Sequence, residues 1–350
     1  MIEALSTSDW HLEGMGKHFT DATKRQLAEI DRIYQYAVQK GIRHVFVPGD
    51  LSETPHMTDA TYFQLIMFFK KYDGLVETHY IGGNHDRSDK STTSCDLLHL
   101  LATHGFFKTL NVHLQPKQDR IDGTLVNFCA WPCGGTLSEK EGALNFAHIT
   151  VAGAMGDNGR PLKTSHDFAV HERDYTISGH IHQYQHMKSK KVIYNGNPFQ
   201  KNFGECLPKG FIHFRATTDK RTVKVQHRFI NNNPQFQLEN VVIESPTDFQ
   251  KLRNDDSKRY KLTVAPDVLL PADLRLQYPN ITGGIFTMVE GKVKAHENEA
   301  NLDIPDAVAL PRISPDVGLK EFLSGEGHTK KEIRRATDIL AEAMNFVGIS

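Results

Sequence analysis

Gly83-Asn84-His85-Asp86 directly follows the apolar segment 76–81 and combines an amide, an imidazole and a carboxylate in one short loop. Four similar clusters occur elsewhere, each just after an apolar run. They are Asp9-Trp-His11, Gly49-Asp50, Ala147-His148 and Gly179-His180-Ile-His182. A single pair of this kind is more often a surface turn or a satisfied core residue. Five in order, each at the end of a strand-like segment, predict one shared metal site.

Two of the clusters have a spacing that suggests how they face an ion. In an extended segment, side chains at positions i and i+2 point the same way. Asp9 and His11 are therefore expected to bind one ion together. His180 and His182 repeat the arrangement, and the residue between the members of each pair is expected to turn into the protein.

The other clusters add oxygen and nitrogen ligands. Gly49 has no Cβ, so the backbone can approach a ligand there, and each oxygen of the Asp50 carboxylate can take one metal. Asp50 is therefore expected to bridge two ions. Asn84 and His148 complete a set of seven ligands without a thiolate, a donor set that suits manganese, iron or zinc.

His85 remains as a candidate catalytic group. If Asn84 faces the metals, its neighbour can project toward the substrate, where an imidazole is a suitable proton donor to a leaving oxygen. Two ions about 3.5–4 Å apart would activate the attacking water and stabilise charge at phosphorus. The pattern predicts hydrolysis of a phosphate ester.

The ordered series D-x-H, G-D, G-N-H-D, H and G-H-x-H resembles the signature of the calcineurin-like metallophosphoesterase superfamily. A further segment, residues 194–205 (YNGNPFQKNFGE), resembles the SbcD-type DNA repair exonucleases of bacteria and phages, which are related to the meiotic-recombination nuclease of eukaryotes. That family reads close to Y-x-G-S-P-x-x-x-x-F-x-E here, so Asn197 replaces its serine. The segment favours a nuclease over a phosphatase.

The resemblance implies a role for each site residue. One metal takes Asp9, His11, Asp50 and His182, and the other takes Asp50, Asn84, His148 and His180. His85 corresponds to the catalytic histidine, and Asp86 to the neighbour that orients it. Two divalent ions are implied, manganese first, with magnesium, iron or zinc as alternatives. Many relatives carry a histidine where this chain has Glu53, so the role of that position is open.

Helix-like and strand-like segments alternate up to residue 81, and Asp122-Gly123 then signals a hairpin, which together predict an α/β fold. The resemblance refines this to the four-layer α-β-β-α sandwich of calcineurin-like phosphoesterases, with a small α/β capping domain and a C-terminal helical segment. The expected domains are a metallophosphoesterase (nuclease) domain at 1–243, a capping and DNA-contact domain at 244–303, and a linker with C-terminal helices at 304–350.

Within the last two regions we expect strands at 260–264 and 284–289, and helices at 271–278, 319–323 and 329–347. The apolar stripe of the last helix is by itself explained by packing on the body of the protein. The resemblance implies instead that this segment docks on the coiled coil of an SMC-like ATPase subunit of the SbcC type. It also implies a homodimer, as in relatives.

Composition sets limits on the partners and the compartment. The 350 residues include 41 basic and 42 acidic ones, which argues against coating DNA by bulk charge, so DNA contacts are expected to be local. No run approaches the ~18 apolar residues of a membrane span, and no basic leader precedes the first strand. A cytoplasmic location, in a bacterial cell or a phage-infected host, and four free cysteines are therefore expected.

These observations predict a two-metal-dependent DNA nuclease, acting as an exonuclease on duplex ends and an endonuclease on single strands, within an SbcCD-like repair or recombination complex. Two alternatives stay open. One is a metallophosphoesterase acting on a nucleotide or another small phosphodiester with the same metal site. The other is a non-catalytic scaffold, which the complete ligand set disfavours.

Overall fold

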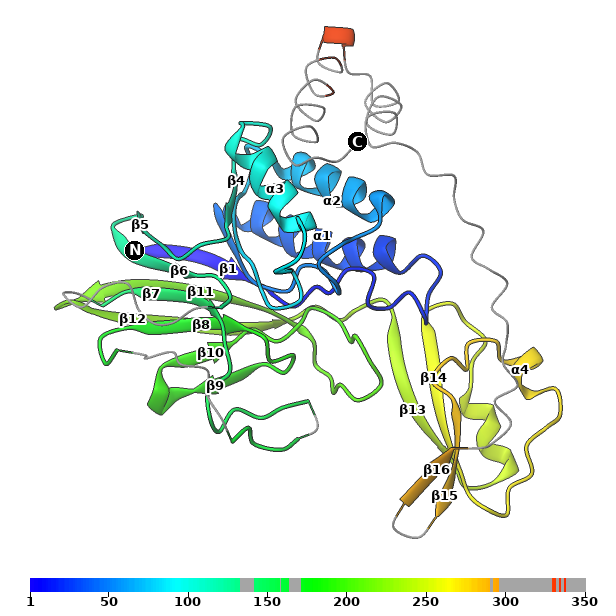
Figure 1. The fold of residues 1–350 in the computed structure, drawn as a ribbon. Coiled ribbons are helices and arrows are strands. Elements are labelled where there is room, and N and C mark those ends of the chain that lie inside the picture. Colours follow the sequence, from blue (N-terminus) through cyan, green and yellow to red (C-terminus); the bar gives the residue numbers. More distant parts are fainter. Residues whose placement is uncertain are drawn as a thin grey trace.

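The computed structural model describes residues 1–132, 142–157, 159–163, 171–289 and 292–295, together with 329–331, 334 and 337. Its strands form three sheets (Figure 1). The linker and the helix expected at 319–323 lie outside the described residues. The helix expected at 329–347 is described only in part, and residues 330, 331, 334 and 337 are helical.

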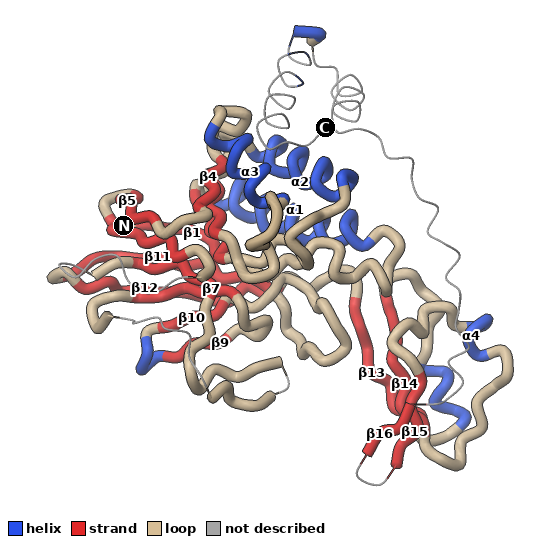
Figure 2. The backbone as a smooth tube through the Cα atoms, viewed as in Figure 1, coloured by secondary structure: helices blue, strands red, loops and turns tan. Residues whose placement is uncertain are grey.

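The first sheet has six strands in the order β12-β11-β1-β2-β3-β4, and β1 to β4 run parallel. Its strands are β1 (Ile2–Ser6), β2 (His44–Pro48), β3 (Glu77–Ile81), β4 (Leu110–His113), β11 (Gly210–Asp219) and β12 (Thr222–Asn231). Three helices connect the parallel strands and cover one face of the sheet, as Figure 2 shows: α1 (Ala22–Lys40), α2 (Asp59–Tyr72) and α3 (Ser94–Thr103).

The second sheet also has six strands, in the order β5-β6-β7-β8-β10-β9. They are β5 (Lys117–Ile121), β6 (Thr124–Cys129), β7 (Leu144–His148), β8 (Tyr175–Gly179), β9 (Gln185–Met187) and β10 (Val192–Tyr194), and the short 3-10 helix η1 (Lys188–Lys190) joins the last two. The hairpin expected at Asp122-Gly123 is confirmed, because β5 and β6 pair antiparallel around it.

The alternation of side chains along β2 explains how the two sheets stack. Val45 and Val47 point toward the helices and join their core, whereas Phe46 points the other way. The ring of Phe46 stacks on Phe146 of the second sheet, with 3.9 Å between the ring centroids. A strand with apolar residues on both faces is buried on both, so β2 lies at the centre of the layered body.

A third sheet, of four strands, lies beside this body (Figure 1). It contains β13 (Gln237–Ile243), β14 (Lys258–Val264), β15 (Ile285–Val289) and β16 (Lys292–Ala295), with the 3-10 helix η2 (Pro246–Lys251) and the helix α4 (Leu274–Gln277). The strands expected at 260–264 and 284–289 fall within β14 and β15, and the helix expected at 271–278 is shorter. Residues 237–243, expected in the first domain, form β13 and pair in parallel with β14.

The α/β class and the two stacked mixed sheets are confirmed, and they are consistent with the calcineurin-like fold. In the described part of the chain, no α-helix covers the outer face of the second sheet; residues of the loop after β7 pack there instead. Cys95, Cys129 and Cys206 are free thiols, and Cys133 lies outside the described residues. No described helix is long and apolar enough to span a membrane.

Candidate metal centre

Five loops meet where the parallel strands of both sheets end. Asp9, Asp50 and Asn84 follow β1, β2 and β3, which are neighbours in the first sheet. His148 ends β7, and His180 follows β8, its neighbour in the second sheet. Because the carboxyl ends of parallel strands lie at one edge of a sheet, stacking the two sheets brings these side chains together. They form two clusters.

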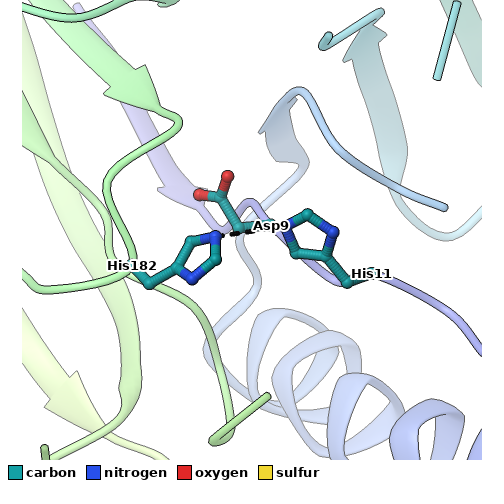
Figure 3. A group of neighbouring side chains, drawn as sticks. All are labelled: Asp9, His11 and His182. Atoms are coloured by element: carbon teal, nitrogen blue, oxygen red, sulfur yellow. Dashed lines mark hydrogen bonds between the residues drawn. The ribbon is translucent and has the colours of Figure 1, made fainter. Parts of the chain in front are cut away.

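The Asp9 cluster consists of Asp9, His11 and His182 (Figure 3). The Nε2 atoms of the two histidines face one another at 3.1 Å. One oxygen of Asp9 accepts a hydrogen bond from the backbone N–H of His180 at 2.9 Å, and the other accepts one from the Ser8 hydroxyl at 2.6 Å. These bonds hold the carboxylate beside both imidazoles.

The Asp50 cluster consists of Asp50, His148 and His180, with Asn84 between the two histidines. Asp50 Oδ2 lies 3.2 Å from His148 Nε2. Asn84 Oδ1 lies 2.9 Å from the same nitrogen and 3.0 Å from His180 Nδ1. The amide oxygen and the carboxylate are therefore both directed at the imidazole nitrogens.

Asp50 also connects the two clusters. Its Oδ2 atom is 3.6 Å from His11 Nε2, a member of the Asp9 cluster. Its Oδ1 atom accepts the backbone N–H of His85 at 2.9 Å, which fixes the rotation of the carboxylate. All seven residues expected as ligands are thus brought together, with Asp50 in the position expected of a bridge.

The donor atoms fit divalent metal ions. In each cluster the ligand atoms lie within 4.8 Å of one another, and Asp9, His11, Asp50 and His148 are buried. Buried histidines and carboxylates converging in this way without a metal would leave several imidazole nitrogens facing each other. Nitrogen and oxygen donors without sulfur suit manganese, iron or zinc, and the geometry does not choose among them.

The backbone at the site is strained. Asp9, His11, Asp50 and His180 have φ angles of 56°, 42°, 53° and 82°, in the left-handed region that non-glycine residues seldom adopt. Such conformations persist only where the surroundings enforce them, and they concentrate at functional sites. They also turn the ligand loops sharply at the strand ends.

The left-handed backbone contradicts the expectation that each pair of ligands lies in an extended segment with both side chains on the same side. Asp9 and His11 do not lie in an extended segment, although they do share a cluster. His180 and His182 do not bind together, because the first joins the Asp50 cluster and the second the Asp9 cluster. The left-handed turn at His180 separates the two side chains. This division is the one that the family resemblance implies.

At two positions of the ligand loops, a neighbouring ligand side chain approaches the backbone so closely that only glycine fits. A Cβ on Gly49 would lie 2.1 Å from His148 Nδ1, and one on Gly83 would lie 2.2 Å from Asp50 Oδ1. Gly49 also has a φ of 92°. The missing side chain at Gly49 therefore makes room for a ligand of the site itself.

The charges of the clusters shift the pKa values of the ligands. Burial lowers the pKa of a histidine, but the carboxylate of Asp50 outweighs this effect and raises the pKa of His148 to about 9. Hydrogen bonds to Asp157 and Glu205 likewise outweigh burial and raise the pKa of His182 to about 10. Burial raises the pKa of Asp50, but the imidazoles of His148 and His11 outweigh it and lower that pKa.

Glu205 is a functional residue whose role the sequence did not reveal. It is buried, and its Oε1 atom lies 3.0 Å from His182 Nδ1, on the side of the ring away from His11. Its Oε2 atom accepts hydrogen bonds from Asn197 at 2.8 Å and pairs with Lys209 at 2.7 Å. A carboxylate behind a metal-binding histidine orients the ring and raises its basicity. The sequence feature that could have indicated this role is the position of Glu205 at the end of segment 194–205.

Glu53 and Lys201 form a second group behind the Asp9 cluster. Glu53 Oε2 lies 3.0 Å from His11 Nδ1 and 2.7 Å from Lys201 Nζ. Burial raises the pKa of the Glu53 carboxyl, but these two partners outweigh it and lower the pKa to about 2. Glu53 therefore faces the rear nitrogen of His11 as an anion.

His85 lies beside the Asp9 cluster, with its ring edge-on to His11 at 4.8 Å between centroids. Its Nδ1 atom is 2.8 Å from the backbone carbonyl of Glu53. Asp86 was expected to orient His85, but the hydrogen-bond partner of the His85 ring is the Glu53 carbonyl. The buried Asp86 carboxylate instead accepts hydrogen bonds from Ser52 and from the backbone N–H of Gly83, so it ties the second and third ligand loops together.

Comparisons with known proteins found similarity among solved structures only. No family model matches the chain, and no curated protein matches it. Among solved structures, Pseudomonas putida nuclease MPE is similar with 14% identity, a TM-score of 0.30, and coverage of 60% of this chain and 83% of that one.

Two further structures are similar at the same level. One is GAP50, the anchor in the inner membrane complex of Plasmodium, with 8% identity, a TM-score of 0.38 and coverage of 66% and 85%. The other is a Vps29 single mutant from Entamoeba histolytica, with 16% identity, a TM-score of 0.30 and coverage of 66% and 100%. These values decide neither substrate nor partner, and the chemistry of the site rests on its own residues.

Proposed function

We propose that this chain is a two-metal-dependent DNA nuclease, acting on duplex ends as an exonuclease and on single strands as an endonuclease. The observation that carries the proposal is the position of Asp50 between two His/Asp clusters, with His85 at the same edge. Bound there, two divalent ions would supply the activated water and offset the charge that develops at phosphorus.

The protein's own residues define the remaining step. The carbonyl of Glu53 can only accept a hydrogen bond, so His85 Nδ1 carries a proton. A proton for the leaving oxygen would have to come from Nε2, on the other side of the ring. An imidazole is suited to this exchange near neutral pH.

DNA is favoured over a small diester because the third sheet extends the surface beside the site. His18, in the loop after β1, contacts Thr282 at 3.0 Å and stacks edge-on against Phe203. Arg259 of β14 donates to the His18 carbonyl at 2.7 Å. Phe203 belongs to the same segment as Glu205, so the third sheet is attached to the loop that positions His182.

The proposal includes the wider assembly that the sequence resemblance implies. The chain would serve as the nuclease subunit of an SbcCD-like repair or recombination complex, with an SMC-like ATPase docked on residues 304–350 and a homodimer through the first helices. These partners are supported by the resemblance of residues 194–205 alone.

The test is degradation of end-labelled linear duplex and single-stranded DNA in manganese, with bis-p-nitrophenyl phosphate as a small diester. His85→Ala is expected to lower DNA cleavage by about 10²–10⁴-fold, the range for loss of a general acid. His56→Ala is the matched control, because this exposed histidine of a neighbouring loop has a side chain that hydrogen-bonds to Ser91 and to no expected ligand among the described residues. Cleavage of the small diester with both DNA substrates intact, also after an SbcC-type ATPase is added, would favour the small-substrate alternative.

A further inference from the structure

A second group of metal-binding residue types lies at the other end of the first sheet. His44 begins β2 and Glu77 begins β3, so both are at the amino ends of strands whose carboxyl ends carry the metal centre. The parallel register sets His44 beside Glu77, and His79 follows two residues later. Glu77 and His79 therefore share a face of β3, and that face meets His44.

The three side chains converge on one point. His44 Nδ1 lies 3.4 Å from His79 Nε2. Glu77 places one oxygen 3.6 Å from His44 Nδ1 and the other 3.6 Å from His79 Nε2. Ligands about 2.0–2.1 Å from a tetrahedral zinc ion are separated from one another by about 3.3–3.4 Å. The observed separations are close to this value without any movement of the backbone.

Ring stacking holds the His79 imidazole in place, and burial acts on both histidines. The His79 ring stacks on Phe46 and Phe128, with 4.9 and 5.4 Å between centroids, so its orientation is fixed. Burial lowers the pKa of His44 and of His79 below the usual value. A neutral imidazole is the form that coordinates a metal.

The group is open to solvent on one side. The Glu77 side chain is 32% exposed, which leaves a path for an ion. Arg43 Nε donates to His44 Nε2 at 3.1 Å, and Asp122 Oδ2 lies 3.6 Å from that nitrogen. Coordination through Nδ1 moves the histidine proton to Nε2. Asp122 can accept a hydrogen bond from that N–H once the exposed Arg43 side chain turns away, which completes a carboxylate–histidine–metal arrangement.

We propose that His44, Glu77 and His79 bind a third divalent metal ion of the zinc class, distinct from the two ions of the catalytic centre. Two imidazoles and one carboxylate are a common zinc donor set, and solvent can supply the fourth ligand. The ion would fasten β2 to β3 at the end of the sheet remote from the chemistry. Its binding does not depend on the proposed nuclease activity.

The test counts zinc bound to the tag-free full chain after loading and dialysis, by mass spectrometry of the metal. Glu77→Gln keeps the shape of the side chain and removes its charge, and it is expected to lose about one zinc per chain. Glu3→Gln is the matched control. Glu3 lies on the neighbouring strand β1, is 34% exposed, and also contacts a histidine, His213 at 2.9 Å. It is expected to lose none.

A second measurement separates this site from the catalytic centre. In an Asp50→Asn background, zinc is expected to raise the melting temperature, and adding Glu77→Gln is expected to make that rise smaller. His44→Gln should reproduce both losses if Glu77→Gln folds poorly. Equal zinc contents and equal zinc-induced shifts with and without Glu77 would overturn the proposal, leaving the group as an ion-pair network in which Arg43 pairs with Glu77 at 3.7 Å and with Asp122 at 3.5 Å.

Discussion

The Asp9 cluster and the Asp50 cluster contain the same kinds of ligand but are held in place by different means. In the Asp9 cluster, the rear nitrogen of each histidine faces a carboxylate: Glu53 behind His11, and Glu205 behind His182. These carboxylates have cationic partners of their own. The orientation of this cluster therefore depends on a network of charged side chains.

The Asp50 cluster is fixed by the backbone. The rear nitrogen of His148 lies 2.9 Å from the carbonyl of Pro48, at the end of β2. The main chain at Gly49 lies so close to the His148 imidazole that a Cβ would not fit between them. The same holds for Gly83 and the Asp50 carboxylate. A cluster held by charged side chains can be tuned by substitution, whereas one held by the main chain tolerates no added atom.

The largest effect should come from an added methyl group at the Asp50 cluster. Gly49→Ala places a Cβ 2.1 Å from His148 Nδ1, and the resulting displacement of a ligand by about 1 Å is expected to lower activity about 100-fold. Phosphodiesterase assays on folded protein check this. Gly105→Ala is the control, because Gly105 also has a positive φ but has nothing within 4 Å of the added Cβ. Similar losses in both variants would mean that backbone conformation, not contact with His148, is responsible.

A smaller effect is expected from the carboxylate network. Glu205→Gln should weaken metal binding at the Asp9 cluster by about 10–100-fold and leave the Asp50 cluster unchanged. It also leaves the buried charge of Lys209 without its anion, so the free energy of unfolding should fall by about 3–5 kcal/mol. Metal titration and chemical denaturation measure the two effects.

Glu239→Gln is the control for Glu205, since it removes a glutamate that pairs with Lys258 in the third sheet. Unchanged metal affinity in Glu205→Gln would contradict the role given to this carboxylate.

Glu53→Gln should lower metal affinity less than Glu205→Gln does. Its carboxylate is about one-third exposed, so water can replace part of its interaction with His11. We expect metal affinity to fall about tenfold, at the lower end of the range for such residues. Titration of both variants side by side is the measurement, and a larger loss in Glu53→Gln would reverse the ranking.

The smallest expected difference between the clusters is in their pH dependence. In the metal-free protein, His148 with a pKa of about 9 and His182 with a pKa of about 10 are protonated at neutral pH. Each metal ion must displace a proton, so affinity should rise with pH, by up to about tenfold per unit for each proton released. The rise should level off at a pH about one unit lower for the Asp50 cluster than for the Asp9 cluster, because the pKa of His148 is about 9 and that of His182 about 10. Calorimetry in buffers of different ionisation enthalpy counts the protons, and uptake without proton release would contradict the shifts.

Local sequence patterns predicted which residues reach the site, because each ligand follows an apolar run that forms a buried strand. The same patterns could not predict how His180 and His182 divide between clusters. The alternation rule assumes extended backbone, and the site has left-handed turns at four ligand residues. The pairing of β13 with β14 was also missed, because the apolar pattern does not specify a strand's partner.

Residues behind the ligands were harder to predict than the ligands themselves. Glu205 lies 23 positions from His182, and only the fold of residues 194–209 places it against the ring. The pair Glu77 and His79 has the same i, i+2 spacing as Asp9 and His11, and here the alternation rule does hold, because β3 is extended. The pair lies within a strand and not in a loop after one, so the loop pattern did not predict it.

By itself the sequence determined the α/β class and the order along the chain of the loops that carry the expected ligands. Those features depend on side-chain chemistry and on the period of apolar residues along each strand. Only the tertiary structure decided which ligands share a cluster, that Asp86 ties two loops together, and that Asp50 stands between the clusters. The reason is that these contacts join the carboxyl ends of strands from two sheets, and the stacking of those sheets is a property of the packed core.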